Sequence, residues 1–521
     1  MIASASAAAG KPDQPFDVCI VGSGPAGITV ARSLPKSLSI ALVEAGGFDY
    51  EADSQKSYEG DTVGLPPDYL STTRSRLFGG SSFCWGGVCR PLDAYDMEHK
   101  DWLDASVAWP FGREELVPYY DRASTLLGLQ SFFADGRDRR ALTRDGAHSE
   151  GLVLVPFQHS DPTLRFGIEF RNELVRAENI TLYLHANAMA FDSAPGGEVR
   201  ALEVVDQARQ RSRIAARYFV LATGGIENPR ILLNSTNAHP AGLGNRHDQL
   251  GRYFMSHTPI WGAGQIVFAD GPARDMESRI RAMKGRICLS LGDDVKRRER
   301  LLNLGLALQY GRRQRLYRGE RYVSRLRAEL LKLGIGLNLG AGAGGNNDFV
   351  ERAVASFAKS TGQGEAALFS FFALPEAVPD PDNRVTLSTR TDDFGMRRVS
   401  VRFRTSEQEA HNLERSLGHI ANRLGGQALG RVRIEFNTHD PATRIPDQHH
   451  MGTTRMHDDP RRGVVDRDCI VHGTRNLFVA GSSVFPSAGF ANPTFTIIAL
   501  AHRIADHLAR SAQSQGGARH G

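Results

Sequence analysis

The chain has 521 residues, too many for one hydrophobic core, so two interlocked domains are expected. Hydrophobic residues make up 41% and charged residues 23%, as in ordinary globular proteins, and a net charge of +5 is too weak to indicate nucleic acid. Five cysteines without a CxxC pair favour a reducing compartment. Residues 1–15 lack the apolar core of a secretory signal, and no apolar run is long enough to span a membrane. We therefore expect a cytoplasmic location.

A dinucleotide-binding pattern opens the chain. A buried-strand pattern over Phe16–Val21 leads into the glycine-rich turn 22–27, and a helix-compatible run follows to about Leu34. A second strand pattern covers 39–43. This strand–turn–helix–strand order is the context in which such a turn binds a pyrophosphate at the helix N-terminus.

Each glycine of that turn has a separate expected role. Gly22 permits the tight bend, Gly24 lets the backbone approach a phosphate, and Gly27 lets helix and strand pack closely. Glu44 ends the second strand, where an acid bonds ribose hydroxyls and argues against NADP. The pattern by itself does not choose between FAD and NAD.

Glycine-rich turns recur downstream. Two Gly-Gly pairs with Phe83 and Trp85 between them lie within 76–87, which favours a backbone wrapped against a flat ligand over an ordinary surface loop. A buried strand over 218–222 ends in glycines, and a helix is expected to start at Asn228-Pro229. Gly196-Gly197 predicts a hairpin between two strand patterns.

The middle of the chain differs in amino-acid composition. The segment 296–332 holds twelve Lys and Arg against three Glu, which favours a solvated helical face over an anionic partner, a membrane surface or a flexible lid. The segment 334–347 is predicted to be a glycine-rich loop. Strand patterns at 366–374, 384–387 and 399–403 precede an amphipathic helix over 407–424. We expect this block to be a substrate domain on an antiparallel sheet.

The C-terminal part contains the candidate catalytic residues. His449 and His450 precede Met-Gly-Thr-Thr, a strand covers 476–481, and Asn492-Pro493 opens a helix to about residue 509. A neutral imidazole is a natural base for removing a hydroxyl proton at neutral pH. His450 should face away from its neighbour, as alternate strand residues do. No ligand cluster accompanies the pair, so no metal is expected.

Together these stretches resemble the glucose–methanol–choline (GMC) family of FAD oxidoreductases, nearest its pyranose 2-oxidase and bacterial sugar dehydrogenase branch. The resemblance implies an α/β, Rossmann-like FAD-binding domain with an inserted α+β substrate-binding domain on an antiparallel sheet. The implied FAD-binding parts are 1–265, with a flavin-covering loop at 74–96, and 436–521. The implied substrate domain is 266–435.

The resemblance also implies site residues. His449 would be the catalytic base and Asn492 its partner, which donates an N–H to the substrate oxygen. His257 and His472 are expected to bond backbone instead. The implied cofactor-binding residues are Gly22, Gly24, Ala26, Gly27, Glu44, Gly79, Gly80, Ser81, Cys84, Trp85, Ala188, Ala222, Gly224, Gly481, Asn492, Pro493 and Thr494.

Relatives with covalently attached flavin carry a histidine after the Gly-Gly pair, where this chain has Ser82 to Trp85, so non-covalent FAD is expected. Cys84 is an open attachment point, although we expect a buried, unreactive thiol. The implied reaction oxidises an alcohol group of a sugar or glycoside, with O₂, a quinone or a protein as electron acceptor. Alternatives are oxidation of an aminoglycoside or other natural-product alcohol, or a lyase with structural FAD. A homo-oligomer is possible.

Overall fold

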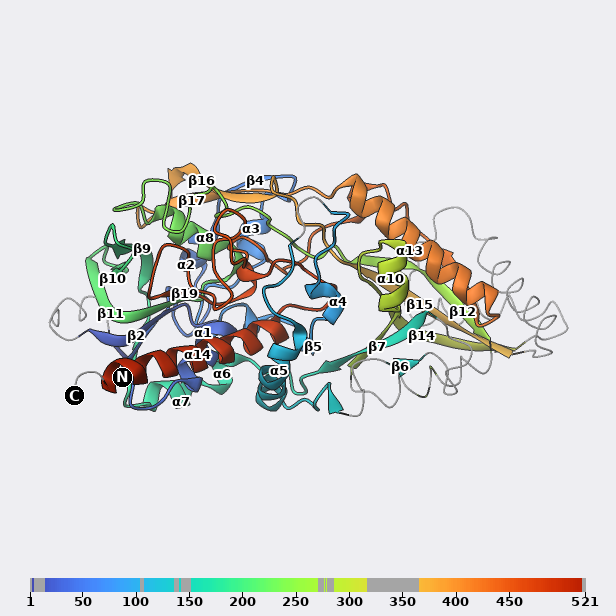
Figure 1. Cartoon of the computed structure of the whole chain (residues 1–521), viewed down its shortest axis with the longest axis horizontal. Coiled ribbons are helices and arrows are strands. Elements are labelled where there is room, and N and C mark those ends of the chain that lie inside the picture. Colours follow the sequence, from blue (N-terminus) through green and yellow to red (C-terminus); the bar gives the residue numbers. More distant parts are fainter. Residues whose placement is uncertain are drawn as a thin grey trace.

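Three β-sheets organise the described part of the chain (Figure 1). The computed structural model describes residues 2–3, 15–103, 107–134, 140–141, 151–269, 276, 278, 285–315 and 365–517. The first and second sheets lie toward opposite ends of the long axis in Figure 1, and the third lies along the top. Among the described helices, none has the length and apolar character needed to cross a membrane.

The first sheet combines parallel strands with an antiparallel extension. Its order is β1-β8-β3-β2-β11-β10-β9, with β19 also paired to β11. The pairings from β1 to β11 and with β19 are parallel, whereas β11, β10 and β9 pair antiparallel. The bounds are β1 Ile2–Ala3, β2 Phe16–Val21, β3 Ile40–Val43, β8 Ile180–Tyr183, β9 Asn187–Ser193, β10 Val199–Val205, β11 Arg211–Leu221 and β19 Leu477–Val479.

The predicted opening of the fold is confirmed. Strand β2, helix α1 (Pro25–Ser33) and strand β3 follow one another as expected, and β9 and β10 form the predicted hairpin. Helix α14 (Thr494–Gly517) packs on α1 and on α5 (Arg113–Leu127), so the end of the chain returns to its beginning.

The register of the parallel strands fixes where a site can form. Val43 pairs with Val21, and Leu221 pairs with both Val21 and Val479. These four strands therefore end at one edge, and the turns that follow them meet there. Ligands bind at this carboxyl edge in open α/β sheets.

The second sheet is antiparallel throughout. Its order is β18-β12-β15-β14-β13-β7-β5, with β6 beside β7. Helix α13 (Glu407–Gly426) covers it, because Leu413, Leu417 and Ile420 share one core with strand residues such as Phe268. The bounds are β5 Val88–Cys89, β6 Arg140–Ala141, β7 Leu152–His159, β12 Ile260–Ala269, β13 Gly285–Leu291, β14 Leu304–Arg315, β15 Glu365–Pro375 and β18 Gly430–Ile434.

The strand patterns at 384–387 and 399–403 are real, but they do not join that sheet. They form β16 (Arg384–Thr391) and β17 (Arg397–Arg402), which build the third sheet with β4 (Asp61–Val63). The parallel pairing of β17 with β4 draws them toward the first domain. The shorter helices are α2 Ala52–Gln55, α3 Tyr69–Thr72, α4 Ala94–Met97, α6 Phe166–Glu169, α7 Arg171–Arg176, α8 Gly224–Asn234 and α10 Asp293–Glu299.

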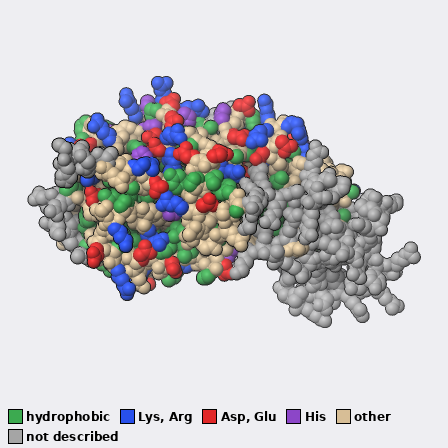
Figure 2. All heavy atoms as spheres, turned by 60° about the horizontal axis from the view of Figure 1, so that its bottom comes forward, with side chains coloured by type: hydrophobic (Ala, Val, Ile, Leu, Met, Phe, Trp, Pro, Cys, Tyr) green, Lys and Arg blue, Asp and Glu red, His purple; other side chains and the backbone are tan. Residues whose placement is uncertain are grey.

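The solvated helical face expected for the basic segment is found only at its start, where Arg297 and Arg298 are exposed on α10. Helix α10 ends at Glu299, and residues 304–315 form the strand β14. Lys296 is buried, with its ammonium 2.7 Å from a carboxylate oxygen of Asp293. Residues 316–332 and the predicted loop 334–347 lie outside the described residues. On the face in Figure 2, basic and acidic side chains are interspersed over the described part.

Candidate active site

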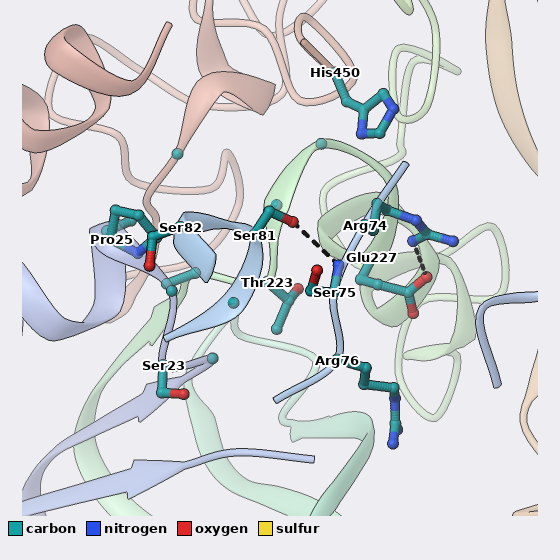
Figure 3. Close-up of a pocket in the computed structure, with 18 of the residues that line it drawn as sticks. Ser23, Pro25, Arg74, Ser75, Arg76, Ser81, Ser82, Thr223, Glu227 and His450 are labelled. Carbon is teal, nitrogen blue, oxygen red and sulfur yellow. Dashed lines mark hydrogen bonds and ion pairs between the residues drawn. The ribbon is translucent and has the colours of Figure 1, made fainter. Parts of the chain in front are cut away.

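A cavity of about 470 Å³ lies at the carboxyl edge of the parallel strands. Its wall combines the ends of those strands, the glycine-rich loop 74–88 and the C-terminal segments (Figure 3). Most of the residues predicted to form the site line it, namely Gly22, Gly24, Ala26, Glu44, Gly80, Ser81, Cys84, Trp85, Ala188, Ala222, Gly224, Gly481, His449, Asn492, Pro493 and Thr494. Gly27 and Gly79 do not, and both have packing roles instead.

The first turn is shaped for close backbone approach. Gly22 has φ +100°, and a Cβ there would lie 2.6 Å from the carbonyl oxygen of Ala222. A Cβ on Gly27 would lie 1.9 Å from the carbonyl oxygen of Gly22, so this glycine allows α1 to pack on β2. A Cβ on Gly24 would meet nothing within 4 Å. Because Gly24 lines the cavity and precedes an uncapped helix N-terminus, this turn fits a pyrophosphate.

Glu44 is anchored beside that turn. One carboxylate oxygen accepts a hydrogen bond from the Ser23 hydroxyl at 2.6 Å, and the other accepts one from the backbone N–H of Gly46 at 2.8 Å. The side chain is buried and lines the cavity. It is therefore held where a ribose would extend from the pyrophosphate.

The glycine-rich loop is fixed by bonds to a later segment. Arg165 donates to the carbonyl oxygens of Ser82 and Trp85, and the Trp85 indole N–H donates to the carbonyl of Leu164 at 2.8 Å. The expectation that Cys84 is buried is wrong: it is exposed on the cavity wall, directly after the short helical turn 80–83.

Sequence reasoning missed a charged wall of the cavity. Arg74 contacts Glu227 at 2.6 Å (Figure 3), and Arg230 joins Glu227 to Asp392. Burial by itself raises the pKa of Glu227, but Arg230 and Arg74 outweigh it and hold that pKa below its usual value. The first contact spans 153 positions in the chain, so no local pattern marks it.

Helix α8 starts earlier than predicted. It begins at Gly224, so Pro229 lies inside it and not near its first turn. A proline has no N–H to donate to the carbonyl four residues earlier, which is that of Gly225. The Thr453 hydroxyl donates to that carbonyl at 2.6 Å. The C-terminal motif thereby completes the helix whose first residues line the cavity.

His449 and Asn492 meet in the cavity, 43 positions apart in sequence. The amide nitrogen of Asn492 lies 3.5 Å from Nε2 of His449. Burial lowers the pKa of His449, an effect that the carboxylate of Asp447 partly offsets. His449 is therefore neutral at neutral pH and can accept a proton.

His450 faces away from its neighbour, as expected. Its Nε2 is 3.1 Å from the Tyr69 hydroxyl, and its ring stacks on Phe254. The backbones of Met255 and Met451 bond each other, as in an antiparallel bridge. This alternation separates the two histidines, although the His450 ring still reaches the cavity edge in Figure 3.

His257 and His472 bond backbone carbonyls, as predicted, but His257 does more. Its Nε2 is 2.9 Å from the carbonyl oxygen of Gly489, and its Nδ1 is 2.9 Å from Nδ1 of His449. Two residues beyond the Met255–Met451 bridge, His257 stands opposite His449 on the same face. Within the described ranges, no group of three or more His, Cys, Asp or Glu could hold a metal.

Comparisons with known proteins relate the chain to flavin enzymes. Residues 379–501 match the C-terminal model of the GMC oxidoreductase family. The chain is 24% identical to the 2-methyl-1,2-propanediol dehydrogenase of Mycolicibacterium austroafricanum, with 95% of each covered. It is 26% identical to the C-glycoside 3-oxidase of Microbacterium trichothecenolyticum, over 95% of this chain and 96% of that one. A formate oxidase variant of Aspergillus oryzae shares its fold with TM-score 0.55 and 17% identity, over 96% of this chain and 99% of that one.

The chain is therefore similar to GMC oxidoreductases in residues 379–501, and it shares its fold with the formate oxidase. The fold is the FAD-binding fold of such enzymes, and the chain is an FAD-dependent oxidoreductase. The open face of Gly24, the anchored Glu44 and the uncapped start of α1 fit this cofactor.

Proposed function

We propose that this enzyme oxidises an alcohol group of a sugar or glycoside to a carbonyl, with His449 as the base. The observation that carries the proposal is the pairing of His449 with Asn492 in the cavity that fits FAD. FAD, when bound, takes up the hydride that leaves the alcohol carbon.

His449 accepts the hydroxyl proton as the hydride leaves. An alkoxide formed without a base is too costly at neutral pH, and a positioned base contributes roughly 10²–10⁴-fold to such a step. The amide of Asn492 cannot accept a proton at neutral pH, so it cannot act as the base. Its N–H donates to the developing carbonyl oxygen and orients the reacting carbon.

The second sheet and α13 form the substrate-binding domain. Its strands come from two parts of the chain, 88–159 and 260–434, so the FAD-binding domain consists of the segments before, between and after them. Support comes from the path of the chain between the two histidines. His257 directly precedes β12 of that sheet, and His449 follows β18 of the same sheet. The segments that enter and leave the second sheet therefore carry His257 and the proposed base His449.

The choice of a sugar or glycoside is supported by similarity to the C-glycoside 3-oxidase over nearly the whole of both chains. A second candidate is a short aliphatic diol, which the similarity to the 2-methyl-1,2-propanediol dehydrogenase favours. Both substrates present a hydroxyl-bearing carbon to the same base. They differ in the volume that the substrate side must accommodate.

The experiment is anaerobic mixing of the FAD-loaded enzyme with free sugars, C- and O-glycosides, aminoglycosides and short diols while the flavin absorbance is followed. Bleaching by sugars or glycosides is expected. Bleaching by diols alone transfers the assignment to the second candidate. If none bleaches a flavin that dithionite still reduces, alcohol oxidation of these classes is refuted and a lyase reaction becomes the explanation.

FAD is held without a covalent bond. The loop from Ser82 to Trp85 offers no histidine, and Cys84 is the one thiol of that stretch on the cavity wall. Acid precipitation should leave all yellow colour in the supernatant. Colour in the pellet that disappears in Cys84→Ser would instead identify a cysteinyl attachment.

A further inference from the structure

We propose that His257 is a positioning residue that fixes the tautomer of His449, so that the unprotonated Nε2 of His449 faces the substrate. This inference rests on the proposed role of His449 as the base. It concerns which ring nitrogen is able to accept the proton.

The backbone carbonyl of Gly489 fixes the tautomer of His257. This carbonyl oxygen can only accept, and it lies 2.9 Å from Nε2 of His257, so that nitrogen carries the hydrogen. A neutral imidazole has a single N–H, which leaves Nδ1 of His257 as an acceptor. That nitrogen lies 2.9 Å from Nδ1 of His449. The hydrogen of His449 is therefore on Nδ1, and its Nε2 keeps a free lone pair.

The other side of the His449 ring agrees with this assignment. Nε2 lies 3.5 Å from the amide nitrogen of Asn492, and both side chains line the cavity. An amide N–H₂ only donates, so it suits an unprotonated ring nitrogen. Substrate hydroxyl and Asn492 can then share the space in front of Nε2.

Asp447 is the competing acceptor for Nδ1–H of His449. Its carboxylate oxygen is 3.9 Å from that nitrogen, too far for a hydrogen bond, whereas His257 is within bonding distance. Its backbone is engaged elsewhere: the carbonyl accepts from Tyr69 and Ser256, and the N–H donates to the carbonyl of His257. The ring of His257 therefore decides the tautomer.

The direction of the chain of bonds requires a neutral His257. A protonated His257 would present donors at both nitrogens and force the opposite tautomer on His449. Burial and the neighbouring His449 lower the pKa of His257 to about 3. At neutral pH, Nδ1–H of His449 therefore donates to His257, and Nε2–H of His257 donates to the carbonyl of Gly489.

Two substitutions separate this role from simple packing. His257→Asn keeps an acceptor oxygen near the place of Nδ1, whereas His257→Leu keeps the bulk and removes the acceptor. In the FAD-loaded enzyme, we expect His257→Leu to slow flavin reduction about 10–100-fold, as removal of an orienting partner does for metal-bound histidines. His257→Asn should stay within about 5-fold of wild type, since it retains the acceptor. Substrate affinity, from the concentration dependence of reduction, should change little in either variant.

The matched control is His472→Leu. His472 also bonds a backbone carbonyl, that of His457 at 2.8 Å, but it does not line the cavity. Its loss should affect the melting temperature more than the reduction rate. Wild-type reduction in His257→Leu, or an equal loss in the Asn and Leu variants with unchanged melting temperature, would overturn the proposal.

A direct measurement holds even where a variant fails to fold. With ¹⁵N-histidine in the wild-type holoenzyme at neutral pH, the ring nitrogens of His449 should report a protonated Nδ1 and an unprotonated Nε2. The opposite pattern refutes the inference. Different results would refute the two proposals. Full activity in His449→Ala would show that His449 is not the base. An inactive His449→Ala together with a fully active His257→Leu would refute only the positioning role of His257.

Discussion

The hydroxyl oxygen of Thr453 lies 2.6 Å from the carbonyl oxygen of Gly225, 228 positions earlier in the chain. Pro229 creates the need for this bond, because it lacks the N–H that would serve that carbonyl within α8. The approach is close: a Cβ on Gly225 would lie 2.4 Å from the carbonyl oxygen of His450. One contact thus holds the histidine-bearing segment against the helix that follows β11.

Removing the Thr453 hydroxyl should therefore destabilise the fold. Thr453→Val keeps the shape and leaves the buried Gly225 carbonyl without its partner, which costs about 1–3 kcal/mol. Thermal unfolding should show a lower melting temperature. The control is Thr72→Val, since the Thr72 hydroxyl bonds an exposed carbonyl that water can serve. Equal melting temperatures for the two variants would contradict this account.

Substituting His449 should stop the chemistry and spare the cofactor. We expect His449→Ala to reduce the rate of flavin reduction by substrate roughly 10²–10⁴-fold, the usual contribution of a general base. The bound-flavin spectrum should persist, since the phosphate and ribose ends of the cavity are untouched. His450→Ala is the neighbouring control: it removes the stacking on Phe254 and should lower the melting temperature. Unimpaired reduction in His449→Ala would mean that another group takes the proton.

Asn492 should matter for the reaction more than for binding. Asn492→Ala removes the N–H directed at the substrate oxygen, and loss of one such donor costs roughly 10²–10³-fold in rate. Rapid mixing under anaerobic conditions measures it, with the FAD dissociation constant determined in parallel. An unchanged reduction rate would show that Asn492 takes no part in the reaction.

The pH dependence of reduction should reflect the burial of His449. The base must be neutral to act, and burial lowers its pKa from the usual 6.5, so the neutral form persists to lower pH. We expect a rate that is constant around neutrality and falls on acidification, with a midpoint below pH 6.5. A midpoint above that value, or a rate that rises as the pH falls, would contradict the assignment.

Alanine substitutions at two glycines of the first turn should have different effects, one on FAD binding and the other on folding. Gly24→Ala places a methyl group on the open cavity wall, so the protein should fold with weakened FAD binding. Gly27→Ala drives a Cβ to 1.9 Å from a backbone oxygen, so the fold itself should suffer. Titration of the apoprotein with FAD and a thermal melt distinguish the two. Tight FAD binding by Gly24→Ala would mean that the phosphates do not approach this glycine.

Much of the first sheet could be predicted because its signals are local. The glycines of the first turn, the strands on both sides and Glu44 lie within 29 residues of each other, from Phe16 to Glu44. Alternation along a strand likewise predicted that His450 would face away from His449. The boundary of α8 was missed because proline is most common at the first position of a helix, whereas Pro229 lies inside α8 and the distant Thr453 hydroxyl bonds the carbonyl that it leaves free.

The sequence by itself determined the dinucleotide turn, the hairpin and the two residues of the candidate reacting pair, since each depends on spacing within a short stretch or on a motif. Only the tertiary structure decided that His257 contacts His449 and that Arg74 pairs with Glu227, contacts that span 192 and 153 positions. The physical reason is that a side chain's hydrogen-bond partner follows from strand register and packing. Neither can be read from the spacing of residues along one chain.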